Sequence, residues 1–175
     1  MVAKSGSAGF KLARVFGLLG VLFGVLLMPV VGRAEGYGNA LKGLKKVSVV
    51  FDVSQGNPKT DNVVFWAVKN VYEDTAVKAL PENPSVAVVF HGAVVKLLST
   101  DQDLFTKEDW PEVEKFQNTL RQMKKDGVAL QVCMYAVKVM RVDPATLLKE
   151  VDQVPNGFVS VAGFQNQGYA VVRLP

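Results

Sequence analysis

The sequence contains one cysteine, Cys133, and one histidine, His91. A single cysteine cannot form a disulfide within the chain, and the two residues together supply too few soft ligands for a zinc site. The chain also lacks the glycine-rich dinucleotide fingerprint, the phosphate-binding P-loop and the serine-centred elbow of hydrolases. The loop Ser54-Gln55-Gly56-Asn57 could hold a small anion, but it lacks the glycine pattern of a phosphate cradle. We therefore expect no metal and no cofactor.

The net charge is zero outside the N-terminal segment of residues 1–34. The chain carries 20 basic and 16 acidic residues, for a formal net charge of +4. Four of the basic residues and none of the acidic ones lie within residues 1–34, so the rest of the chain is balanced; these four are Lys4, Lys11, Arg14 and Arg33. A balanced domain gives no support to nucleic-acid binding, and we expect no nucleic-acid partner.

The first 34 residues have the pattern of a secretory signal peptide. Positive residues precede an apolar run from Val15 to Val31, and a short segment of small residues ends at Ala34. The pattern predicts cleavage between Ala34 and Glu35, a periplasmic location, and no membrane association after cleavage. No cysteine follows the apolar run, which excludes lipoprotein processing. The alternative is an uncleaved anchor, because the run is near the lower limit of about 17 residues for a spanning helix.

Residues 46–174 alternate short apolar runs with amphipathic patterns. We expect strands over residues 46–53, 85–91, 128–132, 158–161 and 169–174. We expect helices over residues 60–76 and 109–127 and from residue 134 onward, with short helical segments at 93–99 and 143–150 and a tight connection at 162–167.

Buried strands that alternate with helices form a parallel sheet that is covered on both faces. We expect the central strands to bury Val49, Phe51, Val88, Phe90, Leu130 and Val132. The length suits one domain over residues 46–175, preceded by a polar, glycine-containing linker over residues 35–45.

The only cysteine lies at a predicted junction between a strand and a helix. The strand over residues 128–132 is followed by a helical pattern that begins at Met134, which places Cys133 between them. In a parallel sheet such junctions lie at the carboxyl edge, where open α/β folds keep their sites. A helix N-terminus favours thiolate over thiol, so Cys133 is a candidate nucleophile. The alternative is a buried structural thiol, since free cysteine is among the most buried residue types.

Two other residues are expected at the same edge. His91 ends the second strand, and an imidazole beside Cys133 could hold a proton or pair with the thiolate. The alternative is a histidine that hydrogen-bonds a backbone group at the strand end. Asp52, near the end of the first strand, is a candidate third member, and the alternative for it is an exposed or capping carboxylate.

Three motifs follow one another along the chain. They are Val88-Val89-Phe90-His91-Gly92, then Gly127-Val128-Ala129-Leu130-x-x-Cys133 with an alanine-bearing helix and Val142-Asp143, and finally Gln165-x-Gln167-Gly168-Tyr169-Ala170. In this order, over residues 46–174, they resemble the DsrE/DsrF-like family, which includes sulfur-relay proteins of sulfur oxidation and of tRNA thiolation. The first and third motifs resemble those of exported members. Two departures are Phe164, where a leucine is common, and the export signal, since the well-understood relays are cytoplasmic hetero-oligomers.

The resemblance implies a three-layer α/β/α, flavodoxin-like fold with a mostly parallel five-stranded sheet, and a homo-oligomer, often a trimer or a hexamer. It also implies that Cys133 carries a persulfide between sulfur donor and acceptor proteins or small sulfur compounds. The predicted function is therefore an exported sulfur-binding or persulfide-transfer protein that acts through Cys133. The alternative is a non-catalytic oligomeric module that binds a small ligand or a partner protein, with Cys133 buried and structural.

Overall fold

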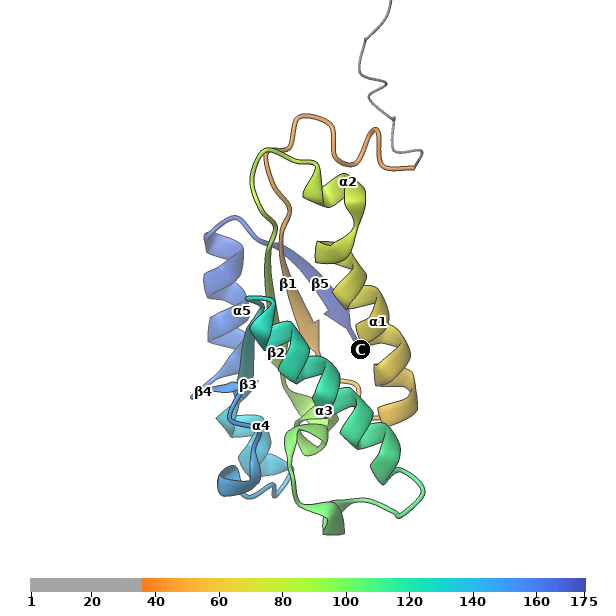
Figure 1. Cartoon of the computed structure of the whole chain (residues 1–175). Coiled ribbons are helices and arrows are strands. Elements are labelled where there is room, and N and C mark those ends of the chain that lie inside the picture. Colours follow the sequence, from red (N-terminus) through yellow and green to blue (C-terminus); the bar gives the residue numbers. More distant parts are fainter. Residues whose placement is uncertain (1–35) are drawn as a thin grey trace, which may run out of the picture. The chain divides into compact units, whose positions relative to one another are not determined.

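The computed structural model describes residues 36–175, which contain one sheet of five parallel strands. The strands are β1 (Ser48–Val53), β2 (Ser85–Phe90), β3 (Ala129–Cys133), β4 (Asp152–Val154) and β5 (Ala170–Leu174). Their order across the sheet is β4-β3-β2-β1-β5, and every neighbouring pair is parallel (Figure 1). The predicted signal peptide over residues 1–34 lies outside the described residues.

Helices cover both faces of this sheet, as a parallel sheet requires. Helix α1 (Pro58–Glu73) packs beside α3 (Trp110–Lys125) on one face, and α5 (Gly157–Asn166) crosses the other (Figure 1). The shorter elements are α2 (Thr75–Lys78), α4 (Met134–Val139) and the 3-10 helices η1 (Gly92–Leu98), η2 (Gln102–Leu104) and η3 (Pro144–Thr146). The expected three-layer α/β/α class with a five-stranded parallel sheet is confirmed. In residues 36–175 no helix is both long enough and apolar enough to cross a membrane.

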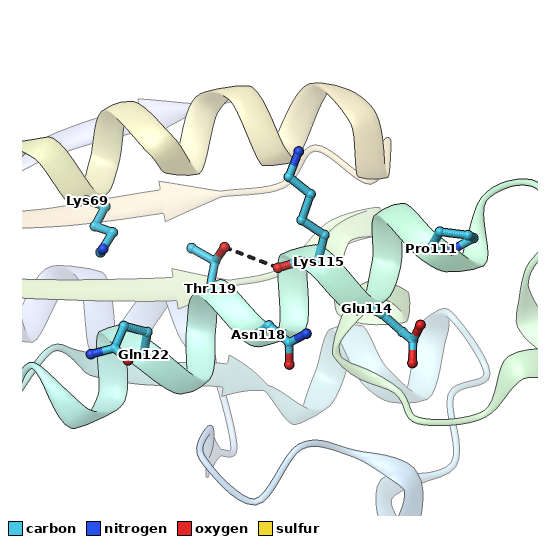
Figure 2. A pocket seen from close by; sticks show the side chains of 7 residues that line it. All are labelled: Lys69, Pro111, Glu114, Lys115, Asn118, Thr119 and Gln122. Carbon is cyan, nitrogen blue, oxygen red and sulfur yellow. Dashed lines mark hydrogen bonds between the residues drawn. The ribbon is translucent and has the colours of Figure 1, made fainter.

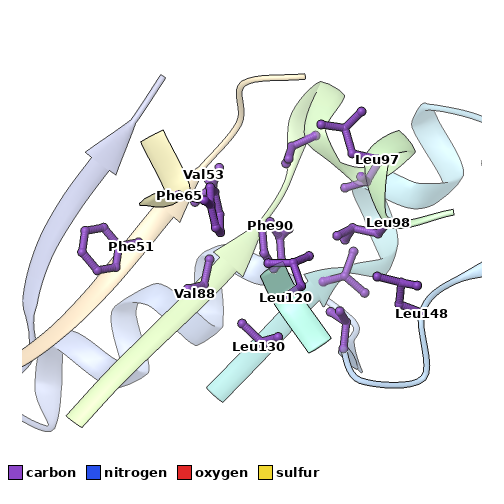
Figure 3. Close-up of a cluster of buried hydrophobic side chains, with 14 of the residues drawn as sticks. Phe51, Val53, Phe65, Val88, Phe90, Leu97, Leu98, Leu120, Leu130 and Leu148 are labelled. Carbon is purple, nitrogen blue, oxygen red and sulfur yellow. The ribbon is translucent and has the colours of Figure 1, made fainter. Parts of the chain in front are cut away.

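The main core lies between the sheet and helices α1 and α3. Alternate residues of β1, β2 and β3 point into it, and all six residues expected there are buried: Val49, Phe51, Val88, Phe90, Leu130 and Val132. Figure 3 shows four of them, Phe51, Val88, Phe90 and Leu130, within this cluster. Phe65 of α1 meets Phe116 of α3 edge to face, with 4.8 Å between the ring centroids. These buried aromatic side chains hold the two helices against the strands.

The opposite face of the sheet has a smaller apolar cluster. Val50, Ala87 and Val89 are buried there, and they pack against partly buried residues of α5 and the chain that follows it, among them Val161 and Phe164. Helix α5 is therefore the principal cover of this face. Its first residue lies beside the carboxyl ends of β2 and β3, as the neighbours of Gly157 show.

The expected strand over residues 158–161 is wrong, because these residues lie in α5. The segment Phe158-Val159-Ser160-Val161 alternates apolar and polar residues in part, which favoured a strand. The Asn156 side chain instead accepts a hydrogen bond of 3.0 Å from the Phe158 N–H and caps a helix. Contact with the sheet then decides the outcome, since tertiary packing overrides weak β propensity. The expected tight connection at 162–167 is also helical, because residues 162–166 form the second half of α5.

The fourth strand of the sheet is β4, which sequence reasoning missed. It has only three residues, Asp152-Gln153-Val154, and two of them are exposed polar side chains. A strand this short on a sheet edge carries no apolar run that a pattern could detect. The helix expected at 143–150 is likewise reduced to the single 3-10 turn η3. At the start of α1 the capping residue is Asn57, with Pro58 in the first turn, so the helix begins two residues before the expected residue 60.

Candidate functional site

The register of β2 and β3 places Cys133 and His91 side by side. Phe90 of β2 is paired with Val132 of β3, so His91 and Cys133 occupy the next position on their two strands. The His91 N–H donates to the Val53 carbonyl at 2.9 Å, which ties this position to β1 as well. The carboxyl ends of three neighbouring strands therefore meet at this point, as the sequence predicts for His91 and Cys133.

Gly157, the first residue of α5, contacts both of these residues. A Cβ placed on Gly157 would lie 2.9 Å from the Cys133 Cβ and 3.6 Å from the His91 Nδ1 atom. The first distance is shorter than carbon atoms tolerate, so only glycine allows the helix to approach this closely. Gly157 thus brings the first turn of α5 over the cysteine and the histidine together. Because a strand was expected over residues 158–161, sequence reasoning missed the role of this glycine.

Asp52 of β1 completes the cluster. Its carboxylate is hydrogen-bonded to the Nε2 atom of His91, and both side chains are largely buried. Asp52 follows Val50 by two residues and His91 follows Val89 by two, which puts both side chains on the α5 face of the sheet. Asp52 is therefore neither a helix cap nor a free surface carboxylate, which were the alternatives that its sequence position left open.

The second ring nitrogen of His91 has no hydrogen-bond partner. Nδ1 is buried, and none of the described residues bonds to it. The expected alternative, a histidine side chain satisfied by a backbone group, is not the arrangement in the structure. Phe158 packs over the ring, with 4.8 Å between centroids, although 67% of its own surface is exposed. A buried ring nitrogen without a partner costs free energy, which is typical of a position kept for function.

Cys133 is buried in this conformation. Only 2% of its surface is exposed, and it stands immediately before α4, at the N-cap position of that helix. Gly157 closes one side of it, and the apolar core that includes Val137 lies on another. The thiol therefore meets a reagent only after the first turn of α5 moves, or after a comparable opening.

The loop considered for a small anion is filled by protein. A Cβ on Gly56 would lie 2.6 Å from the Ala93 Cβ, so the loop packs directly onto η1. The Asn57 side chain is used to cap α1, where it accepts a hydrogen bond of 3.0 Å from the Thr60 N–H. In residues 36–175 no group of three or more His, Cys, Asp or Glu side chains could hold a metal ion.

A surface hollow lies along the outer side of α3, on the face of the sheet opposite α5. It is lined mainly by polar side chains of that helix, including Glu114 and Gln122, together with Lys69 of α1 (Figure 2). The hollow is open to solvent and holds neither a cysteine nor a histidine. The candidate site in residues 36–175 is therefore the cluster at the carboxyl edge of β1, β2 and β3.

Known proteins share this chain's sequence pattern and fold. A curated protein of Aquifex aeolicus, described as uncharacterized, is 25% identical over 132 residues, which cover 72% of this chain and 55% of that protein. This chain thus spans about half the length of the curated relative that it matches.

Two solved structures are also similar. The protein of unknown function MTH1491 from Methanobacterium thermoautotrophicum superposes with a TM-score of 0.57 at 20% identity, over 74% of this chain and all of that one. The ychN protein from E. coli gives a TM-score of 0.48 at 12% identity, over 73% of this chain and all of that one. The first of these shows the same α/β fold. The DsrE/DsrF-like family matches residues 45–174, which is most of the sequence. This protein belongs to the DsrE/DsrF-like family.

Proposed function

We propose that this protein binds sulfur or transfers a persulfide through Cys133. The only thiol and the only imidazole of the chain both contact Gly157, and this juxtaposition is the observation that supports the function most directly. A persulfide carrier needs a thiolate that can attack a donor sulfur, and a neighbouring base provides it. His91 is that neighbour, and its Nδ1 atom has no hydrogen-bond partner among the described residues.

The transfer step balances without an oxidant. The Cys133 thiol gives its proton to His91, and the thiolate attacks the outer sulfur of a donor persulfide. The donor's sulfur–sulfur bond breaks, and its electron pair leaves with the donor as a thiolate that takes the proton from His91. Cys133 then holds a persulfide, and an acceptor thiolate removes the outer sulfur by the same chemistry.

The proposed function also includes export of the protein across the inner membrane. The protein acts in the periplasm, after removal of residues 1–34, on sulfur donor and acceptor proteins or small sulfur compounds. It acts as a homo-oligomer, as a trimer or hexamer. Exposed apolar side chains beside the cysteine, on α4 and on the first turn of α5, support a covered surface here: Tyr135, Val139, Phe158 and Val159.

A second candidate function rests on the burial of the thiol. Cys133 is only 2% exposed, which is what a structural cysteine in a binding module would show. In that case the oligomer binds a small ligand or a partner protein near the strand ends, and the sulfur takes no part. The two functions differ in whether Cys133 reacts while the protein remains folded.

Intact mass spectrometry distinguishes these functions. The full chain, expressed with its leader and purified from the periplasm, is incubated with glutathione persulfide and weighed before and after reduction. Sulfur transfer predicts an added sulfur that is absent from a Cys133→Ser variant and is removed by the reductant. The binding-module function predicts no added sulfur, and a thiol that native-state alkylation reaches only after denaturation.

A further inference from the structure

The hydrogen bond between Asp52 and His91 has a direction. An ionised carboxylate can only accept, so the Nε2 atom of His91 carries the proton in this bond. A neutral imidazole has one protonated nitrogen and one with a lone pair. With its proton on Nε2, the ring presents the lone pair at Nδ1.

The nitrogen that carries this lone pair and the cysteine both lie against Gly157. Nδ1 lies 3.6 Å from the position of a Cβ on Gly157, and the Cys133 Cβ lies 2.9 Å from the same position. Nδ1 is buried and has no partner in the part of the chain that the structure describes. The nitrogen that the tautomer leaves basic is therefore the one that shares Gly157 as a neighbour with Cys133.

We propose that Asp52 is a positioning residue for sulfur transfer, which holds His91 with its proton on Nε2 so that Nδ1 accepts the proton of the Cys133 thiol. This rests on the proposed function and adds a residue to it. The logic is that of a nucleophile, a base and an orienting carboxylate, with each member on a neighbouring strand. Asp52 comes from β1, His91 follows β2, and Cys133 ends β3.

Within residues 36–175, the titratable side chains that lie beside the imidazole are those of Asp52 and Cys133. Asp52 reaches it from β1 and Cys133 lies beside it from β3, while α5 contributes Gly157 and Phe158, neither of which titrates. The reactivity of the thiol should therefore follow the state of this pair alone. A purely structural role for Asp52, as a tie between β1 and the end of β2, would change stability and leave that reactivity unchanged.

Nitrogen NMR of the untagged full chain tests the tautomer directly. His91 is the only histidine, so the protein has a single pair of imidazole nitrogen signals. We expect the proton on Nε2 at neutral pH, and Nδ1 with the shift of an unprotonated nitrogen. A neutral ring with its proton on Nδ1 would overturn the assignment of Asp52. The measurement uses the wild-type protein, so it does not depend on the folding of a variant.

The pH profile of native-state alkylation tests the consequence for Cys133. Asp52→Asn donates to Nε2 and forces the proton onto Nδ1, so the labelling rate at neutral pH should fall about a hundredfold, which is the low end of the contribution of a positioned acid–base group. His91→Ala should lower the labelling rate by the same factor. The double variant should lower it no further, because the pair acts as a unit. Asp52→Glu, which keeps a carboxylate, should restore part of the rate. Asp103→Asn removes the same charge at an exposed site and should change nothing.

Failure of this inference differs from failure of the proposed function. Unchanged labelling in Asp52→Asn, together with normal addition of sulfur from glutathione persulfide, would remove Asp52 from the site and leave Cys133 as the carrier. A lowered labelling rate without any added sulfur in the wild-type chain would keep the Asp52–His91 pair and reject sulfur transfer. The thermal unfolding midpoint of each variant shows that the protein is folded during the measurement.

Discussion

Gly157 of α5 lies directly against Cys133 of β3, so that a Cβ on the glycine would stand 2.9 Å from the Cβ of the cysteine. The contact joins the cover of the sheet's second face to the only thiol. It also closes one side of Cys133 with a residue that has no side chain. Any movement of the first turn of α5 changes access to the cysteine and to His91 together.

Gly157→Ala should open the site. The added methyl group cannot fit beside Cys133, so the first turn of α5 must shift, at a cost of about 1–3 kcal/mol in the free energy of unfolding. We expect native-state alkylation of Cys133 to become several-fold faster. Gly163→Ala is the matched control, because Gly163 lies in the same helix and its added Cβ would meet nothing within 4 Å. Equal labelling of both variants would show that α5 does not control access.

Val88→Asp should prevent stable folding. Val88 is fully buried in the central strand β2, and a carboxylate there would lie in the apolar core without a partner, at a cost of several kcal/mol. Val63→Asp makes the same change on the outer side of α1, where 71% of the side chain is exposed, and should change the melting temperature little. A soluble Val88→Asp variant with unchanged cooperative melting would mean that β2 does not occupy the centre of the sheet.

Asp61 should make the protein less stable as the pH rises from about 4 to 7. Burial raises the pKa of this carboxyl from 3.8 to about 6, and neither of its oxygens has a hydrogen-bond partner among the described residues. Because the folded protein holds this proton more tightly than the unfolded chain does, the stabilisation is complete below the unfolded pKa. It is lost as the pH rises through the folded pKa, and amounts to about 3 kcal/mol for a shift of two units.

Asp61→Asn removes this titration. Urea unfolding at pH 4 and at pH 7 should show the variant close to the wild type at the lower pH, and more stable by on the order of 1–3 kcal/mol at the higher pH. A wild-type stability that rises between these two values, with the same rise in the variant, would contradict the assignment to Asp61.

The leader should be removed on export. A positive segment, an apolar run and the small residues that end at Ala34 predict a mature protein that begins at Glu35. N-terminal sequencing of the periplasmic protein checks this directly. Recovery of the full-length chain in the membrane fraction would instead support the uncleaved anchor.

The sequence by itself determined the class of the fold and the position of His91 and Cys133 at the ends of two strands. The apolar runs around Val49, Val88 and Leu130 are short and contain valines, so β1, β2 and β3 could be placed, and the alternation with helices required a parallel sheet. From that placement alone His91 and Cys133 were expected at one edge, because parallel strands end on the same side.

Only the tertiary structure decided which side chains of that edge meet. The bond between Asp52 and His91, and the contact of Gly157 with both His91 and Cys133, join residues far apart in the chain. The same holds for α5, whose residues Phe158 to Val161 have a strand-like composition but fold as a helix, because Asn156 caps them and the sheet provides a face to cover. A local pattern carries propensity and periodicity, whereas the pairing of distant side chains and the burial of a thiol depend on how the elements pack.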